Sequence, residues 1–208
     1  MKKTLLLLLI PMLGCAASPE AVYNHSKDKI VKIGLVVGKR HGICSGAFID
    51  SEGTILTAAH CVADRDITKI FVKKEDETYY QATVVKIDTA KDLALIRIYT
   101  PWERTPYFSF GAEGVRGQEV LAFGSPLGLQ HSVSIGYIEN IVDKGQSFVL
   151  HGASILPGSS GGPLVDLHGR LIGVNTAMLM LNMFSVAPGY LIAVDVTEIR
   201  AFLSKEPI

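Results

Sequence analysis

Short runs rich in Val, Ile, Leu, Thr and Tyr follow one another along most of this chain, and turn residues separate them. Many of the runs alternate apolar and polar residues, which is the period of a β-strand with one buried face. Clear examples are IVKIGLVV at 30–37, YYQATVVKID at 79–88, LALIRIY at 93–99 and EVLAFG at 119–124. Because no long helical segment intervenes, the sequence predicts an all-β barrel or sandwich.

One helix is predicted, at the C-terminus over residues 196–204. Asp195 can cap it, and Glu198 can complete a capping box three residues later. Three apolar side chains of this segment fall on one face of the predicted helix: Ile199, Phe202 and Leu203.

A weak internal repeat relates residues 46–56 to residues 162–172 at a constant offset of 116. Both segments read as a β-hairpin whose turn begins with an aspartate and contains a glycine able to take positive φ. Hairpins of this kind also recur by chance, so two interpretations stay open. If the repeat is real, the chain consists of two similar β halves, and a site between them would draw residues from both.

The composition indicates a folded protein and argues against nucleic acid as a partner. The 208 residues suit one compact domain or two small ones, and 48% hydrophobic content is enough for a sizeable core. The 20 basic and 20 acidic side chains balance, and no stretch clusters Lys and Arg as phosphate binding requires.

The first residues, MKKTLLLLLIPMLGCAAS, combine two lysines, an apolar run and small residues, which predicts a secretory signal peptide over 1–17. Two processing routes remain open. One is ordinary cleavage after Ala17, and the other is lipoprotein cleavage before Cys15, because Met12-Leu13-Gly14-Cys15 resembles a lipobox. We expect export from a bacterial cytoplasm, either as a periplasmic or cell-envelope lipoprotein held to the membrane through Cys15, or as a secreted protein.

The cysteine count supports the lipoprotein route. An exported chain with Cys15, Cys44 and Cys61 has one thiol that cannot pair within the chain, and lipidation of Cys15 would leave an even number of thiols. Cys44 and Cys61 could then form a disulfide in an oxidising compartment. In the chain-entropy model, a cross-link that closes a loop of this length stabilises the folded state by roughly 3 kcal/mol.

Three local sequences could supply a nucleophile, a base and a carboxylate: GSSGG with Ser160, TAAHC with His60, and KDLALI with Asp92. A serine hydroxyl is a weak nucleophile until an imidazole removes its proton, and the imidazole needs a carboxylate to fix its tautomer. Each piece alone has a simpler explanation, such as a structural histidine or a solvated aspartate. The combination is what indicates catalysis.

TAAHC, DLALI and GSSGGPLV, in that order, resemble the trypsin-like serine proteases, and the residues around them are closest to the HtrA-type (Deg) bacterial branch. Supporting matches include GAFIDSEGTILTAAH, VLAFGSPLGL and ILPGSSGGPLVDLHGRLIGVNTA. The resemblance runs from about residue 33 to 203. It implies a protease domain over 28–208, built of two six-stranded antiparallel β-barrels at about 28–104 and 105–195.

The resemblance also assigns roles in a serine endopeptidase. His60 would be the general base, Asp92 would orient it, and Ser160 would attack the substrate carbonyl. Backbone N–H groups of Gly158 and Ser160 would form the oxyanion hole. Asp88 is the competitor of Asp92, although it does not lie at the start of LALI. No cofactor or metal is implied.

Two departures from the family pattern are informative. The pair Cys44 and Cys61 matches a disulfide beside the catalytic histidine that is more typical of animal trypsin-like enzymes than of HtrA-type ones. Ser159 stands where trypsin-like digestive enzymes have an aspartate that pairs with a newly cut N-terminus. We therefore expect no zymogen cleavage of the digestive type.

The residues expected to line the pocket for the residue before the cut carry no acid: Ser154, Ile155, Leu156, Thr176 and Ala177. The segment 151–156 and the strand at 174–177 would supply them. An uncharged, partly apolar pocket argues against Lys or Arg and favours small or medium aliphatic residues such as Val, Ala or Leu.

Other functions remain as alternatives. GSSGG also fits the G-x-S-x-G elbow of α/β-hydrolases, but a strand instead of a helix follows the serine, and the later histidine lies in a hairpin turn. A protease-like fold that only binds peptides is the main rival. The remaining histidines show no metal-ligand spacing and are expected on the surface or in loops: His25, His41, His131 and His151. We expect protein or peptide substrates, no PDZ domain within these residues, and an undetermined oligomeric state.

Overall fold

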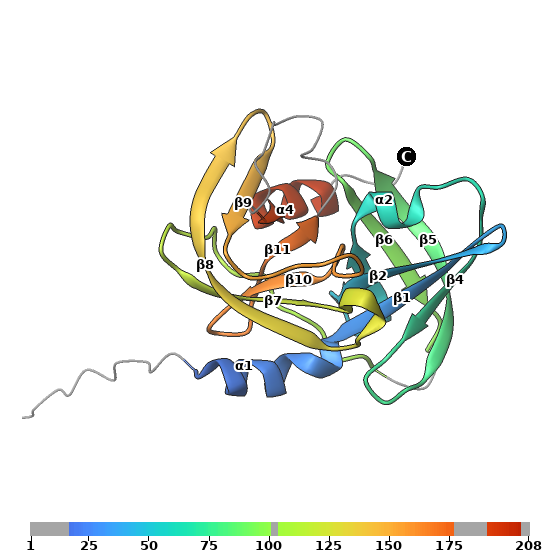
Figure 1. The fold of residues 1–208 in the computed structure, drawn as a ribbon. Helices are drawn as coiled ribbons and strands as arrows, with labels where there is room; N and C mark the ends of the chain where they lie inside the picture. Colours follow the sequence, from blue (N-terminus) through green and yellow to red (C-terminus); the bar gives the residue numbers. More distant parts are fainter. Residues whose placement is uncertain (1–16, 101–103, 177–190, 205–208) are drawn as a thin grey trace, which may run out of the picture.

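The computed structural model describes residues 17–100, 104–176 and 191–204, and its strands form two closed antiparallel barrels (Figure 1). Barrel one contains β1 (Ile30–Val37), β2 (Arg40–Phe48), β3 (Thr54–Thr57), β4 (Ile67–Lys73), β5 (Tyr79–Asp88) and β6 (Leu93–Ile98). Barrel two contains β7 (Glu119–Gly124), β8 (Ser132–Asp143), β9 (Ser147–His151), β10 (Pro163–Asp166), β11 (Leu171–Thr176) and β12 (Leu191–Asp195). The predicted all-β class with two six-stranded barrels is confirmed.

The two barrels share one strand order. Barrel one closes as β1-β2-β3-β6-β5-β4, and barrel two closes as β7-β8-β9-β12-β11-β10 when read from its first strand. The repeat seen in the sequence relates the β2–β3 hairpin to the β10–β11 hairpin, and these occupy different positions in that order. The sequence repeat is therefore a local turn and not the duplication that relates the barrels.

The turn itself was predicted correctly. The Oδ1 atoms of Asp50 and Asp166 each accept backbone N–H groups two and four residues later, at 2.8 to 3.0 Å. Gly53 and Gly169 follow at φ of 87° and 70°, which an L side chain rarely adopts. In both turns the aspartate side chain accepts backbone N–H groups in place of a backbone carbonyl. This shared role explains why the same residue pattern occurs in the two turns.

Helix α4 (Val196–Ser204) forms as predicted; it packs on barrel two, and Ile199 and Phe202 are buried. Asp195 caps it, because its Oδ1 accepts the backbone N–H of Thr197 at 2.8 Å. The predicted capping box is wrong. Glu198 instead accepts the Ser147 backbone N–H at 3.0 Å and pairs with Lys91.

Helices at other places were not predicted. Helix α1 (Pro19–Ser26) starts where Ser18 Oγ accepts the Ala21 N–H at 3.2 Å and Pro19 takes the first helical position. A 3-10 turn, η1 (Lys27–Lys29), joins it to β1. Two short elements lie near the candidate site: α2 (Ala59–Val62) and the 3-10 turn η2 (Pro126–Gly128). Among the described residues, no helix is both long and apolar enough to cross a membrane.

His151 is a buried strand residue, so the expectation of a surface or loop position was wrong. It is the last residue of β9, is 0% exposed, and pairs across the sheet with Ile138 and Leu191. Burial lowers the pKa of His151 from its ordinary value of 6.5 to about 4, although the Ala153 backbone and the Asn175 side chain oppose the shift. The imidazole is thus neutral inside barrel two at neutral pH.

We expect His151 to make the protein acid-sensitive. The unfolded chain takes up a proton at this side chain below pH about 6.5 and the folded protein only near pH 4, so stability falls as the pH drops between these values. The loss is roughly 2 kcal/mol between pH 7.5 and 4.5. Urea unfolding should show a smaller acid-induced loss for His151→Gln than for the wild type, whereas the exposed control His41→Gln should lose as much as the wild type. Equal losses in all three proteins would contradict this.

Candidate active site

The three predicted catalytic residues occupy loops and a short helix rather than strands. His60 lies in α2, directly after β3, and Asp92 lies in the turn between β5 and β6. Ser160 lies in the loop between β9 and β10 of the other barrel. Hydrogen bonds that join the barrels surround these residues, so the candidate site draws on both barrels, as a two-half architecture predicts.

Asp92 and His60 are joined at two points. The imidazole Nδ1 lies 2.8 Å from Asp92 Oδ2 and 3.1 Å from Oδ1, and the His60 backbone N–H donates to Oδ1 at 2.8 Å. Asp92 is 1% exposed and has a φ of 54°, which aspartate tolerates better than most residues. A carboxylate only accepts hydrogen bonds, so the proton of a neutral imidazole must sit on Nδ1, and Nε2 is left free as a base.

Thr176 has a different place from the one predicted. It was expected to line the substrate pocket, but it is 1% exposed and its hydroxyl donates to Asp92 Oδ2 at 2.5 Å. Strand β11 of barrel two thereby holds the carboxylate supplied by barrel one. The contact joins residues 84 positions apart, and no local pattern in the sequence signals it.

The nucleophile loop, residues 154–162, is arranged so that Gly158 presents its N–H to the site. The Pro157 carbonyl accepts the Leu127 N–H at 2.8 Å, and in a trans peptide the next N–H must point the opposite way. Gly158 has a φ of 103°, and a Cβ there would lie 2.4 Å from the Ser125 carbonyl oxygen. Within the part of the chain that the structure describes, the N–H groups of Gly158 and Ser160 have no acceptor. Both are therefore available to an oxyanion.

Ser45, a residue that the sequence did not single out, fastens this loop to barrel one. Its hydroxyl donates to the Gly158 carbonyl at 2.7 Å and accepts the Ser125 N–H at 2.8 Å. Its backbone N–H donates to the Ser160 carbonyl at 2.8 Å. Ser45 is 0% exposed, so each of these bonds lies away from water, where an unpaired partner is costly.

Replacing Ser45 with alanine should lower kcat about 100-fold with a smaller effect on KM, because the Gly158 carbonyl loses the hydrogen bond that helps to hold this residue, and with it the oxyanion-hole N–H, in position. Steady-state kinetics on a peptide substrate would measure both constants. The matched control is Thr57→Val, since the buried Thr57 hydroxyl donates to the Ser45 carbonyl at 2.8 Å within barrel one. If both variants lose kcat equally, Ser45 acts only through general stability.

The predicted disulfide is present, between Cys44 and Cys61 with Cα atoms 6.2 Å apart. It joins β2 to α2, and its two cysteines directly adjoin Ser45 and His60 in the sequence. The disulfide therefore links the segment that holds the nucleophile loop to the segment that carries the predicted base. The two sulfur atoms lie close to the imidazole, but they are bonded to each other and offer no thiolate to a metal.

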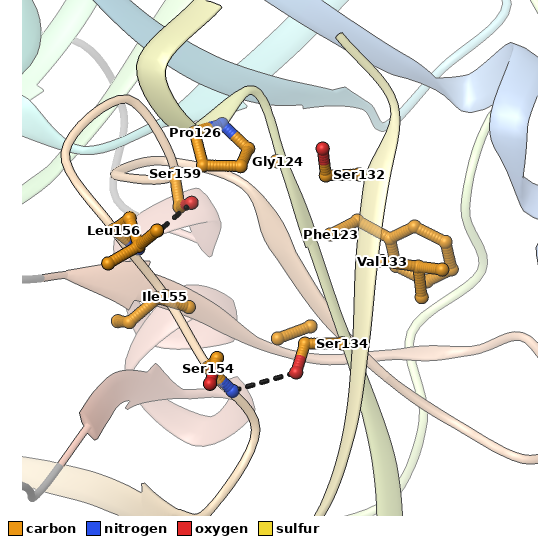
Figure 2. Close-up of a pocket in the computed structure, with 11 residues that line it drawn as sticks. Phe123, Gly124, Pro126, Ser132, Val133, Ser134, Ser154, Ile155, Leu156 and Ser159 are labelled. Carbon is orange, nitrogen blue, oxygen red and sulfur yellow. Dashed lines mark hydrogen bonds between the residues drawn. The ribbon is translucent and has the colours of Figure 1, made fainter. Parts of the chain in front are cut away.

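Three of the five predicted pocket residues share one pocket of about 250 Å³: Ser154, Ile155 and Leu156 (Figure 2). Strands β7 and β8 form its other wall, and Thr176 does not line it. Ala177 lies outside the described residues, as does Cys15. The composition of the substrate pocket therefore stays a prediction.

Known proteins resemble this chain in sequence. The family described as the trypsin-like peptidase domain matches residues 44–174. A "Probable periplasmic serine endoprotease DegP-like" of Chlamydia pneumoniae is 38% identical over 144 residues, which are 65% of this chain and 28% of that protein. "Serine protease HTRA2, mitochondrial" of Drosophila willistoni is 33% identical over 172 residues, which are 77% of this chain and 38% of that protein. The chain thus spans well under half the length of these relatives.

Solved structures resemble it in fold. An "HtrA-type protease AlgW with tripeptide" superposes with a TM-score of 0.78 at 24% identity, covering 89% of this chain and 62% of that one. A "serine endoprotease from Yersinia pestis" superposes with a TM-score of 0.77 at 25% identity, covering 90% and 65%. Together with the family match over residues 44–174, these similarities show that the chain belongs to the trypsin-like peptidase domain family.

Proposed function

We propose that the protein is a serine endopeptidase that hydrolyses protein or peptide substrates through an acyl-enzyme. Ser160 is the nucleophile, His60 the general base, and Asp92 the group that orients the imidazole. The observation that carries this proposal is the 2.8 Å contact between His60 Nδ1 and the buried Asp92 Oδ2, which leaves Nε2 as the proton acceptor. The free N–H groups of Gly158 and Ser160 support it, since they can stabilise the tetrahedral oxyanion.

Labelling with a fluorophosphonate tests this proposal against the rival of a peptide-binding scaffold. The reagent phosphonylates a serine whose proton a neighbouring base removes, and its fluoride leaves. We expect labelling at Ser160, identified by mass spectrometry of the proteolytic fragment that contains residues 158–162. An intact protein that resists the reagent, or a label on another residue, would favour the scaffold.

We propose that cleavage follows small or medium aliphatic residues. The described part of the segment predicted to bind this residue carries no acid, and His151 within it is neutral and buried at neutral pH. A carboxylate is what a Lys or Arg side chain would need for pairing in a pocket. Profiling with a peptide library should show Val, Ala or Leu before the cut, and cleavage after basic residues would refute the proposal.

We infer that the protein is exported and lipidated at Cys15. The support is the sequence pattern of residues 1–17 together with a disulfide that requires an oxidising compartment. The relative from Chlamydia pneumoniae is named as periplasmic. Metabolic labelling with an alkyne fatty acid in a bacterial host should mark the wild type and not Cys15→Ala, and an unmarked wild type would favour ordinary cleavage.

A further inference from the structure

The backbone of Asp92 adopts a conformation that needs support from both sides. Its φ of 54° lies in the left-handed region, which a residue with a side chain keeps only where its surroundings hold it. The planar peptide groups before and after Asp92 set this conformation, so their carbonyl oxygens are the atoms to hold. On one side, the carbonyl of Asp92 itself accepts the Ala59 N–H at 3.1 Å. The peptide on the other side needs a partner of its own.

Gln146 supplies that partner from the other barrel. Its side-chain Nε2 donates to the Lys91 carbonyl at 2.9 Å, and this carbonyl belongs to the peptide that leads into Asp92. Gln146 lies in the turn between β8 and β9, 55 positions further along the chain. Removing its amide would release the peptide before Asp92 and leave the aspartate side chain intact.

Glu198 of helix α4 holds Gln146 and Lys91 in their places. Its Oε1 accepts the N–H of Ser147, the residue after Gln146, at 3.0 Å, and its Oε2 pairs with the ammonium group of Lys91. The side chains of Lys91 and Glu198 are only 19% and 14% exposed, so salt screens this pair less than a surface pair. One carboxylate thus ties the turn that carries Gln146 to the turn that carries Asp92.

We propose that Gln146 is a positioning residue for Asp92 and that Glu198 sets the place of Gln146. The inference rests on the proposed peptidase function, in which Asp92 orients the imidazole of His60. Without the Gln146 amide, the peptide between Lys91 and Asp92 can turn toward a favoured φ. The carboxylate moves with its backbone, and the 2.8 Å contact between Asp92 Oδ2 and His60 Nδ1 lengthens. The base is then present but poorly oriented.

The first test replaces Gln146 with methionine, which keeps the length of the side chain but has no N–H to donate. We expect kcat for peptide hydrolysis to fall about tenfold, with KM within about twofold of the wild type, because a slightly misplaced catalytic group slows the reaction without weakening substrate binding. Steady-state kinetics on a peptide substrate would measure both constants.

The matched control is Gln130→Met, which removes a similar bond between the barrels. Gln130 Nε2 donates to the Lys74 carbonyl at 2.8 Å, in the turn between β4 and β5 and not in the turn that carries Asp92. Its kcat should stay within about threefold of the wild type, as expected for one hydrogen bond lost away from the triad. Equal kcat values in Gln146→Met and Gln130→Met would overturn the proposal.

A spectroscopic measurement tests the contact itself without relying on turnover. The proton on His60 Nδ1 reports its hydrogen bond to Asp92 through its NMR chemical shift, and Ser160→Ala is the background in which to record it. Adding Gln146→Met should move or broaden this signal, whereas adding Gln130→Met should leave it unchanged. An unchanged signal with Gln146→Met would overturn the proposal even if kcat falls. A signal that moves, in a protein whose wild type hydrolyses no peptide, would reject the peptidase function and support the positioning of Asp92 by Gln146.

Glu198 provides a graded pair of further variants. Glu198→Gln keeps an oxygen for the Ser147 N–H and loses the charge that pairs with Lys91, whereas Glu198→Ala loses both contacts. We expect kcat to fall about threefold in Glu198→Gln and about tenfold in Glu198→Ala. Because Glu198→Ala acts through Gln146, combining it with Gln146→Met should cost little more than either change alone. Losses that multiply in the double variant would refute the role of Glu198 in placing Gln146.

Discussion

Replacing Ser160 with alanine is expected to lower kcat for peptide hydrolysis by about a millionfold, the loss typical of a missing nucleophile in a serine protease. Ser160 is 8% exposed, and alanine removes only its hydroxyl, so the substitution should leave the fold intact. Casein digestion and a chromogenic peptide would measure the activity, and circular dichroism melting would check the fold. Hydrolysis by Ser160→Ala at the wild-type rate would refute the assignment of Ser160 as the nucleophile.

The neighbouring serine provides the matched comparison for Ser160. Ser159 carries the same hydroxyl in the same loop, but it lines the pocket of about 250 Å³ that Ser160 does not line, and its hydroxyl accepts a 3.4 Å contact from the Leu156 N–H. Ser159→Ala should therefore lose less than about tenfold in kcat, as expected for one weak hydrogen bond. If Ser159→Ala is inactive and Ser160→Ala is active, the roles of the two serines are reversed.

The sequence predicted those features that a few adjacent residues determine. Strand alternation predicted the all-β class, Asp195 predicted the start of the last helix, and the aspartate turns at Asp50 and Asp166 formed as expected. His60, Asp92 and Ser160 each lie in a short motif, and the three motifs together predicted a catalytic triad. In each case the sequence signal lies within a few positions along the chain, even where the contact itself, such as that between His60 and Asp92, does not.

The residues that the sequence did not reveal act over long separations. Ser45 holds Gly158 from 113 positions away, and Thr176 holds Asp92 from 84 positions away. Which side chains meet across two barrels depends on how the barrels close, and strand patterns do not specify that closure. The same reason explains the two errors at Glu198 and His151, whose partners come from other parts of the chain.

Asp92→Asn should lower kcat about ten-thousandfold without disturbing the backbone, because asparagine tolerates a φ of 54° at least as well as aspartate. The His60 backbone N–H requires an acceptor at the Oδ1 position, so the amide oxygen of the asparagine must occupy it. The NH2 group then lies at the Oδ2 position, 2.8 Å from Nδ1 of the imidazole. Nδ1 must accept that hydrogen bond, and the ring proton moves to Nε2, where it blocks the base.

The control for this variant is Asp88→Asn, which alters the other candidate carboxylate. Asp88 Oδ1 accepts the Lys91 N–H at 3.0 Å and so shapes the turn that leads to Asp92 without contacting His60. An asparagine oxygen can accept the same bond, so kcat should stay within about threefold of the wild type. The two substitutions remove the same charge four positions apart. A large loss at 88 with a small loss at 92 would show that the imidazole takes its orientation from a different carboxylate, and the geometry around Asp92 would then have no catalytic meaning.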